Sequence, residues 1–155
     1  MSDVTSSKLY VPALGGLYAG ATPVFEALLR FVAGAWMVPH GAQKLFGLFG
    51  GYGIGGTAQF FSSVGLEPAV PLAVIAGLAE FVGGILLAIG LFTRPAAVAL
   101  TILLAVAVLS VHAGAGFFMA SGGFEYAGLW FFLTLYFVFR GGNKYSVDAA
   151  LGRSF

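Results

Sequence analysis

The feature that most constrains this chain is residues 24–44, an apolar stretch that carries three basic side chains. Its sequence, VFEALLRFVAGAWMVPHGAQK, is apolar enough to enter a membrane, yet it holds Arg30, His40 and Lys44. At ~100° per residue of a helix, these three side chains fall within one sector of roughly 80°. A cation near the bilayer centre costs at least ~2.5–3.5 kcal/mol, so it should face protein or water and have a partner. The stretch therefore predicts a membrane helix with one polar face directed inward.

The composition of the whole chain supports a membrane environment. Hydrophobic residues make up 59% of the 155 residues and charged residues 8%, whereas a soluble domain averages about 25% charged residues. So few charges cannot cover a water-facing surface, and the length favours one domain. The net charge is +1, and no basic patch indicates a nucleic-acid partner. An integral membrane protein in contact with the lipid bilayer is predicted.

The absence of cysteine restricts the chemistry of the chain. With no cysteine, disulfides, Cys-ligated clusters, c-type haem attachment and thiol–disulfide exchange are excluded. Any electron transfer would need a bound cofactor or a partner subunit. The chain therefore has no redox-active residue of its own to offer such a reaction.

Four apolar segments predict an all-α fold, a four-helix transmembrane bundle. The predicted spans are residues 24–42, 69–91, 95–113 and 126–140. Residues 1–23 are expected to form a tail that is loose or lies at the membrane surface, and not a signal peptide, since Asp3 and a Ser/Thr run precede Lys8. Residues 141–155 form a polar tail. The fourth segment is short of the ~20 residues that a span needs, so it should begin inside the preceding connection or the bilayer should be thinner there.

Two breaks in the pattern shape the first half of the chain. Pro39 is expected to kink or end the first helix and to turn His40 toward the interior. Residues 45–68 then contain seven glycines and several aromatic side chains. They predict a Gly- and aromatic-rich loop between the first two helices, lying at the membrane interface or re-entering the membrane.

The second apolar segment carries a stripe of small residues around one carboxylate, Glu80. Small residues let membrane helices approach closely, so Glu80 should be buried against a neighbouring helix. At 1.5 Å rise per residue, Glu80 and Arg30 differ in depth by ~6 Å, a gap that an arginine side chain can bridge. Two interpretations stay open: a structural ion pair that fixes helix register, or a site for protons or a quinone. The stripe comprises Ala73, Ala76, Gly77, Gly83 and Gly84.

The distribution of cations predicts the orientation of the chain. Four spans would place both ends on one side of the membrane. The cations on that side are Lys8, Arg94, Arg140, Lys144 and Arg153. The other side has Lys44, with Glu67 and Glu125. The positive-inside rule then predicts that both termini are cytoplasmic. The predicted location of the protein is the inner or plasma membrane.

The polar residues predicted at the outer side have several possible roles. His40 and His112 are expected to cap helices and bond at the interface, to ligate a haem b, to bind a metal with Glu80 or Glu125, or to hydrogen-bond a quinone carbonyl. Two histidines without ligand spacing do not predict a metal site. Lys44 and Glu125 are expected to form a solvated pair, or Lys44 to bind a substrate anion.

Aromatic residues crowd the last predicted span. They suggest a surface that faces lipid or a partner, or one that lines an isoprenoid tail. These residues are Trp130, Phe131, Phe132, Tyr136, Phe137 and Phe139.

The order of these features resembles the DoxX family of small four-helix membrane proteins. The motifs are LLRFVAGAWMVPHGAQKLFG (28–47), GLAEFVGGILLAIGLFTRPAA (77–97), His112, GGFEYA (122–127) and GGNKYSVD (141–148). Gly142 stands where the family often has proline, which concerns only the local turn. The resemblance implies a four-helix integral membrane protein, and some members of the family are subunits of membrane oxidoreductases, including thiosulfate:quinone oxidoreductase.

The leading functional hypothesis is a membrane subunit of a quinone-linked oxidoreductase system. Glu80 and Arg30 are the predicted catalytic residues, with Glu80 handling protons. The predicted quinone-binding residues are His40, Lys44, His112 and Glu125. The alternative is a non-catalytic accessory subunit that packs on other membrane or redox subunits. A small transporter fits less well, because the two halves show no internal repeat.

Overall fold

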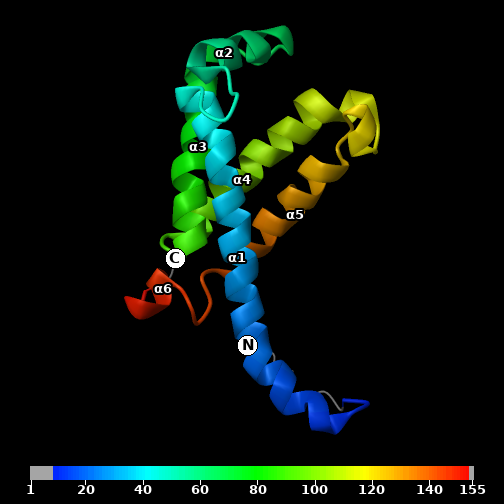
Figure 1. Cartoon of the computed structure of the whole chain (residues 1–155), viewed down its shortest axis with the longest axis vertical. Coiled ribbons are helices and arrows are strands. Elements are labelled where there is room, and N and C mark those ends of the chain that lie inside the picture. Colours follow the sequence, from blue (N-terminus) through cyan, green and yellow to red (C-terminus); the bar gives the residue numbers. More distant parts are fainter. Residues whose placement is uncertain (1–8, 154–155) are drawn as a thin grey trace.

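The structure is a computed structural model that describes residues 9–153, and this part of the chain is helical without strands (Figure 1). Its α-helices are α1 (Gly15–Phe46), α2 (Gly53–Ser63), α3 (Ala69–Ile89), α4 (Thr93–Ala107), α5 (Glu125–Arg140) and α6 (Val147–Ala150). Shorter turns are η2 (Pro12–Leu14), the π-helical η3 (Val108–His112), η4 (Ala113–Ala115) and η5 (Met119–Ser121). Lys8, which entered the orientation argument, lies outside the described residues.

Within residues 9–153, three helical stretches are long and apolar enough to cross a membrane. They are Pro12–Phe46, Ala69–Ile89 and Thr93–Ala115. Helix α5 has 16 residues, fewer than the ~20 that a span normally takes, and it begins at Glu125 rather than inside the preceding connection. The all-helical membrane fold is thus confirmed, while the count of four spans is not.

Helix α1 is longer at both ends than predicted. It begins at Gly15 instead of about residue 24, so much of the predicted tail is helical. It also runs through Pro39 to Phe46, so of the two expectations for Pro39, a kink or an end of the helix, the end is wrong. Proline is tolerated inside membrane helices because neighbouring helices and local adjustments satisfy the freed backbone groups. The helix ends where Gly47 adopts a left-handed φ of 70°.

The glycine-rich segment predicted as a loop contains helix α2. Its 11 residues, GIGGTAQFFSS, form a helix despite three glycines. Ala58 packs against Ala69 and Ala73 of α3, with Phe61 beside them. Tertiary packing of this kind routinely overrides weak intrinsic helix propensity, which explains why glycine content alone mispredicted the segment.

Helices α1 and α3 touch backbone to backbone through glycines. A Cβ atom on Gly34 would lie under 3.0 Å from Ala88 N and Gly84 O, and one on Gly41 would lie equally close to Phe81 N and Gly77 O. Two members of the predicted small-residue stripe, Gly77 and Gly84, lie in this contact with α1. Of the other members, Gly83 faces α4 and Ala73 packs against Ala58 of α2. Such a contact places α1 side chains directly against α3.

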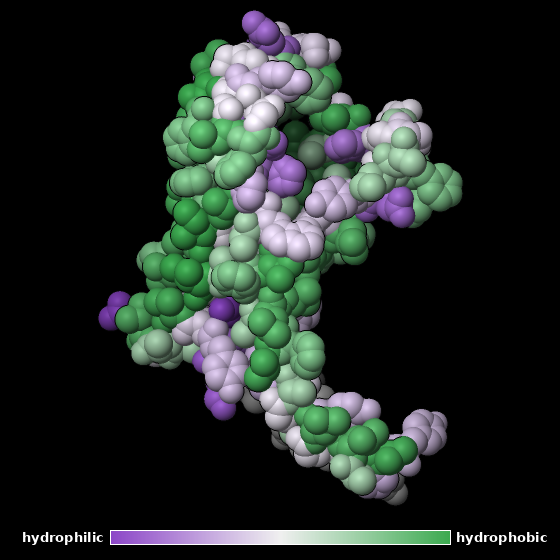
Figure 2. Space-filling model, in the orientation of Figure 1, coloured by the Kyte–Doolittle hydropathy of each residue, from purple (hydrophilic) through white to green (hydrophobic). Residues whose placement is uncertain are grey.

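Helices α4 and α5 form a second pair that joins the core near one end of the molecule. Leu100 and Phe137 are fully buried between them, and Thr101 Oγ1 bonds Thr134 Oγ1 at 3.0 Å. Toward the opposite end this pair diverges from α1 and α3 (Figure 1). Figure 2 shows a hollow there, between the upper part of α1 and the far ends of α4 and α5, with hydrophilic side chains beside it.

Hydrophobic side chains cover most of the visible surface of α1 and α3 in Figure 2, as expected for lipid-facing helices.

The aromatic residues of α5 do not share one environment. Trp130 and Phe137 are buried in the core, whereas Phe132 and Phe139 are exposed. The prediction that these aromatic residues form one surface facing lipid or a partner is therefore wrong for Trp130 and Phe137. Their seven-residue spacing places both on the helix face that points inward.

Candidate functional site

The centre of the candidate site is an ion pair between α1 and α3. Lys44 Nζ lies 2.6 Å from Glu80 Oε2 and 2.8 Å from Glu80 Oε1. The Glu80 side chain is 7% exposed and that of Lys44 is 25% exposed. The close approach of Gly41 to Gly77, one turn from each partner, brings the two side chains within reach. Glu80 thus has a cationic partner, as an acidic residue within an apolar helix requires.

The predicted partner of Glu80 was Arg30, and that pairing is wrong. Arg30 lies 14 residues before Lys44, about 21 Å along α1 at 1.5 Å per residue. It lies instead beside Gly90, where α3 ends. The similar depth estimated from the sequence did not mean contact, because the estimate took the first span as residues 24–42, whereas α1 runs from Gly15 to Phe46.

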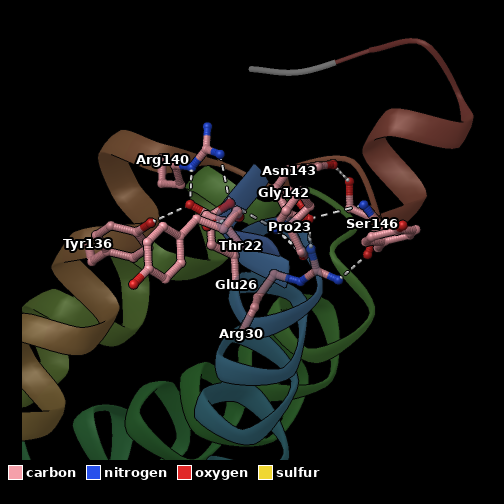
Figure 3. Close-up of polar contacts among 11 residues, drawn as sticks. Thr22, Pro23, Glu26, Arg30, Tyr136, Arg140, Gly142, Asn143 and Ser146 are labelled. Atoms are coloured by element: carbon pink, nitrogen blue, oxygen red, sulfur yellow. Dashed lines mark hydrogen bonds and ion pairs between the residues drawn. The ribbon is translucent and has the colours of Figure 1, made fainter. Parts of the chain in front are cut away.

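Arg30 is buried against the segment that follows α5 (Figure 3). Its Nη1 donates to Gly142 O and, at 3.3 Å, to Asn143 Oδ1, and its Nη2 donates to Tyr145 O at 2.7 Å. Its Nε is buried without a hydrogen-bond partner. Arg30 thus ties the C-terminal segment to the bundle.

A second ion pair, which sequence analysis missed, lies beside Arg30. Arg140 Nη2 lies 2.7 Å from Glu26 Oε2, and Arg140 Nε donates to Glu26 Oε1 at 2.8 Å. The Tyr136 hydroxyl donates to the same Oε1 at 2.8 Å (Figure 3). The available signal was the four-residue spacing of Tyr136 and Arg140, which places both on one helix face.

Asp148 closes the same end of the bundle. Its Oδ1 accepts from Phe92 N at 2.8 Å, and its Oδ2 accepts from Thr93 N at 2.9 Å and Thr93 Oγ1 at 2.7 Å. Burial alone would raise the pKa of this carboxyl, but these hydrogen bonds and the charge of Arg30 outweigh burial and hold the pKa below its usual value. The aspartate thereby satisfies backbone N–H groups at the start of α4.

The residues predicted for the outer cluster divide into two groups. His40 lies on α1 one turn before Lys44, and therefore on the helix that supplies the cation of the ion pair. His112 Nδ1 bonds Gly122 O at 2.8 Å, and Glu125 Oε2 accepts from Met119 N at 3.1 Å. These last two bonds lie within the connection between α4 and α5, so Lys44 pairs with Glu80 and not with Glu125 as one interpretation expected.

A pocket of about 590 Å³ lies beside the ion pair. It is formed by the end of α1, the glycine turn after it and α2. Its lining includes Gln43, Lys44, Tyr52, Thr57, Phe60 and Phe61. Among the described residues, no group of three or more His, Asp or Glu side chains could hold a metal ion. Because Lys44 lines the pocket and is paired with Glu80, the site can present the Lys44 ammonium group to a small ligand with hydrogen-bond acceptors.

The fold and this ion pair define a multi-pass, all-helical membrane protein with a charged pair buried between two of its helices. The chain belongs to the DoxX family, whose model matches residues 25–113. That match covers the chain from residue 25 of α1 through η3, and therefore both partners of the ion pair.

Two bacterial proteins resemble the chain. A Haemophilus influenzae protein described as uncharacterized is 38% identical over 133 residues, which cover 81% of this chain and 90% of that protein. A Bacillus subtilis protein named "Putative oxidoreductase CatD" is 37% identical over 99 residues, 64% of this chain and 67% of its own length. No solved structure matches the chain significantly.

Proposed function

We propose that the protein is a membrane subunit of a quinone-linked oxidoreductase system and binds the quinone head group beside Lys44. The observation that carries the proposal is the pairing of Glu80, 5% exposed within a membrane helix, with a lysine that lines a pocket. Structural ion pairs alone do not need an adjoining pocket. The name of the Bacillus subtilis relative agrees with this reaction class.

The chemistry of the pair suits quinone reduction. A quinone takes up two electrons and two protons to become a quinol, so its oxygens need proton donors as charge develops on them. Lys44 would transfer one proton from its ammonium group to a quinone oxygen, and the Glu80 carboxylate would pass a proton taken up from water to Lys44 and so restore the ammonium. The second proton would follow by the same route. Because the chain has no cysteine, we assign the electrons to a partner subunit or a soluble donor.

The remaining predicted site residues receive different roles. His40 would tune the charge of the Glu80 site from one helical turn away. Arg30 would position α1 through the C-terminal segment rather than act in catalysis, and His112 and Glu125 would shape the α4–α5 connection. A haem b remains the less favoured cofactor; the bond of His112 Nδ1 to Gly122 O leaves Nε2 as the nitrogen that would ligate it.

We also propose that α5 is a fourth crossing and that both termini face the cytoplasm. The first part of α1 and helix α6 lie at the same end of the molecule (Figure 1). Cations also gather at that end, as the positive-inside rule requires of a cytoplasmic side. They are Arg94, Arg140, Lys144 and Arg153.

A competing role as a non-catalytic accessory subunit draws support from α5. Its outward face carries exposed side chains at three- and four-residue spacing: Leu129, Phe132, Tyr136 and Phe139. Such a face can pack against a partner helix in the membrane. In that case, Phe132→Ser with Phe139→Ser would abolish association with the larger complex, and Glu80→Gln would change only stability.

The test is quinone binding by purified protein in nanodiscs, with a short-chain quinone titrated against tryptophan fluorescence. We expect Lys44→Met to weaken binding by at least ~10-fold, as loss of a charge-assisted hydrogen bond implies. Glu26→Gln is the matched control, because it breaks the other ion pair and should leave binding unchanged. Equal binding by the wild type and Lys44→Met, or none by the wild type, would refute the proposal.

A further inference from the structure

The first part of α1 extends beyond the helices that surround the rest of it. Helix α1 has 32 residues, or about 48 Å at 1.5 Å per residue, against a hydrocarbon core of about 30 Å. Arg30 already lies level with Gly90, the end of α3. Residues 15–25, called the arm below, therefore project past that end, where Figure 1 shows them turning aside from the axis of the helix. Pro23 lies inside the helix and accounts for such a bend.

The arm has no charged residue, and its large side chains are exposed. Leu17 is 63% exposed, Tyr18 44% and Phe25 68%. With Ala21 these residues follow the spacing of one helix face, whereas Gly16 and Gly20 on the other side have open space around them. Figure 2 shows the arm as a largely hydrophobic projection. An uncharged helix with such a face is not stable in water without something to cover it.

A groove joins this face of the arm to the body of the protein. Its volume is about 520 Å³, and its walls come from α1 and from Tyr136 of α5. Apolar side chains make up most of the lining, including Leu17, Tyr18, Phe25 and Leu29. Its polar end contains Glu26, which bonds Tyr136 and Arg140.

We propose that the arm lies in the lipid–water interface of the leaflet at this end of the bundle, with lipid acyl chains filling the groove. The bend turns the arm toward the membrane plane, and tyrosine prefers the depth of the headgroups. Charge favours lipid over a second apolar arm, because among the described residues of this end four cations outside the core exceed the two carboxylates of Glu26 and Asp148. These cations, Arg94, Arg140, Lys144 and Arg153, would attract anionic headgroups. The arm thus acts as an interfacial anchor.

The cysteine-free chain allows a direct test by spin labelling. Single variants Leu17→Cys on the apolar face and Gly16→Cys on the opposite face carry a nitroxide in liposomes of phosphatidylethanolamine and phosphatidylglycerol. Ile75→Cys, on the exposed face of α3, gives the lipid reference, and Ala149→Cys on α6, also exposed, gives the water reference. The measurement is the collision rate with oxygen, which concentrates in lipid, and with a nickel chelate, which stays in water.

We expect the ratio of oxygen to nickel collisions at Leu17 to fall between the two references and to exceed that at Gly16 at least twofold. A ratio at Leu17 equal to that of Ala149 would place the arm in water and overturn the proposal. Protection of Leu17 from both reagents would overturn it too, because a protein surface, such as a second copy, would then cover the groove. All four positions are exposed, so labelling should leave the fold intact.

Discussion

Lys44 and Glu80 depend on one another because neither charge is stable alone in this position. A buried pair gains little over apolar residues of the same size, but loss of one partner leaves an uncompensated charge away from water. The short distances of 2.6 and 2.8 Å from Lys44 Nζ to the two carboxylate oxygens indicate that the charges compensate each other fully. Comparing variants in which one partner is replaced with a variant in which both are replaced therefore separates the effect of the pair on stability from its effect on function.

Replacing Lys44 by Met should lower the free energy of unfolding by about 3–5 kcal/mol, because Glu80 would remain buried without its cation. The double variant Lys44→Met with Glu80→Gln should recover most of that loss. Thermal unfolding in detergent measures both. If the double variant is as unstable as the sum of the single variants, the two residues do not form a coupled pair.

Asp148 should make stability depend on pH in an acidic window. Despite burial, hydrogen bonds and the charge of Arg30 lower its pKa in the folded protein from the ordinary value of 3.8, so its contribution is present above about pH 3.8 and is lost as the pH falls through the lower folded pKa. Asp148→Asn removes this dependence. The melting temperatures of wild type and variant should differ at pH 6 and converge toward pH 2; a constant difference would contradict the assignment.

Single residues also show where sequence analysis reached its limit. The need of Glu80 for a buried cation follows from hydropathy alone, and that expectation held. The predicted identity of that cation, Arg30, was wrong, because contact between two side chains depends on the rotation of their helices as well as on their depth. Lys44 was placed at the outer interface, because the first span was expected to end at about residue 42. Glu26 was overlooked because its partner, Arg140, is more than a hundred positions away.

Among the elements, the pairing of α1 with α3 depends on glycine rather than on large apolar side chains. Gly34 and Gly41 are seven residues apart, so both lie on the face of α1 that meets α3. Each lies where a methyl group would collide with backbone atoms of the other helix. The backbones of α1 and α3 therefore approach so closely at these two positions that only glycine fits there.

Gly41→Ala should destabilise the protein by about 1–3 kcal/mol, the usual cost of overpacking a tight contact. It should also weaken the Lys44–Glu80 pair by moving α1 outward. Gly83→Ala is the matched control, since the new methyl group would meet its nearest neighbour at an ordinary 3.8 Å. Melting temperatures in detergent compare the two. Equal stability of both variants would show that α1 and α3 are not in backbone contact at Gly41.

The elements themselves were predicted unevenly. Long apolar runs gave the centres of α1, α3, α4 and α5, since hydrophobic length is a strong signal in membrane proteins. Helix α2 was missed because its stability comes from packing of Ala58 on α3, which local sequence does not encode. The start of α1 was missed for a similar reason: three glycines and Pro12 favoured a tail, whereas the structure continues the helix from Gly15.

At the scale of the whole molecule, the two ends of the described chain lie on one side of the bundle (Figure 1). The C-terminal segment is held there by hydrogen bonds from Arg30 and by the bonds of Asp148 to Phe92 and Thr93. Four crossings satisfy this arrangement, whereas three crossings would place the ends on opposite sides. The topology is thus accessible to a simple labelling experiment.

Single cysteines at Ala149 and at Gly50, in the turn before α2, should react on opposite sides of the membrane. In intact cells, a membrane-impermeant maleimide should modify Gly50→Cys and spare Ala149→Cys until the cells are opened. Gly50 has open space around it, although its positive φ of 77° calls for a check of folding. Labelling of both positions in intact cells would contradict cytoplasmic termini.

The backbone contacts of α1 with α3 have a mechanical consequence. Two helices that meet at Gly34 and again at Gly41 have no room there for larger residues, so sliding along each other would bring neighbouring side chains against the backbone. We therefore expect the pair to move as one unit that carries Lys44 and Glu80 together. Larger movements are expected at the other joint, where α4 and α5 diverge from this unit (Figure 1).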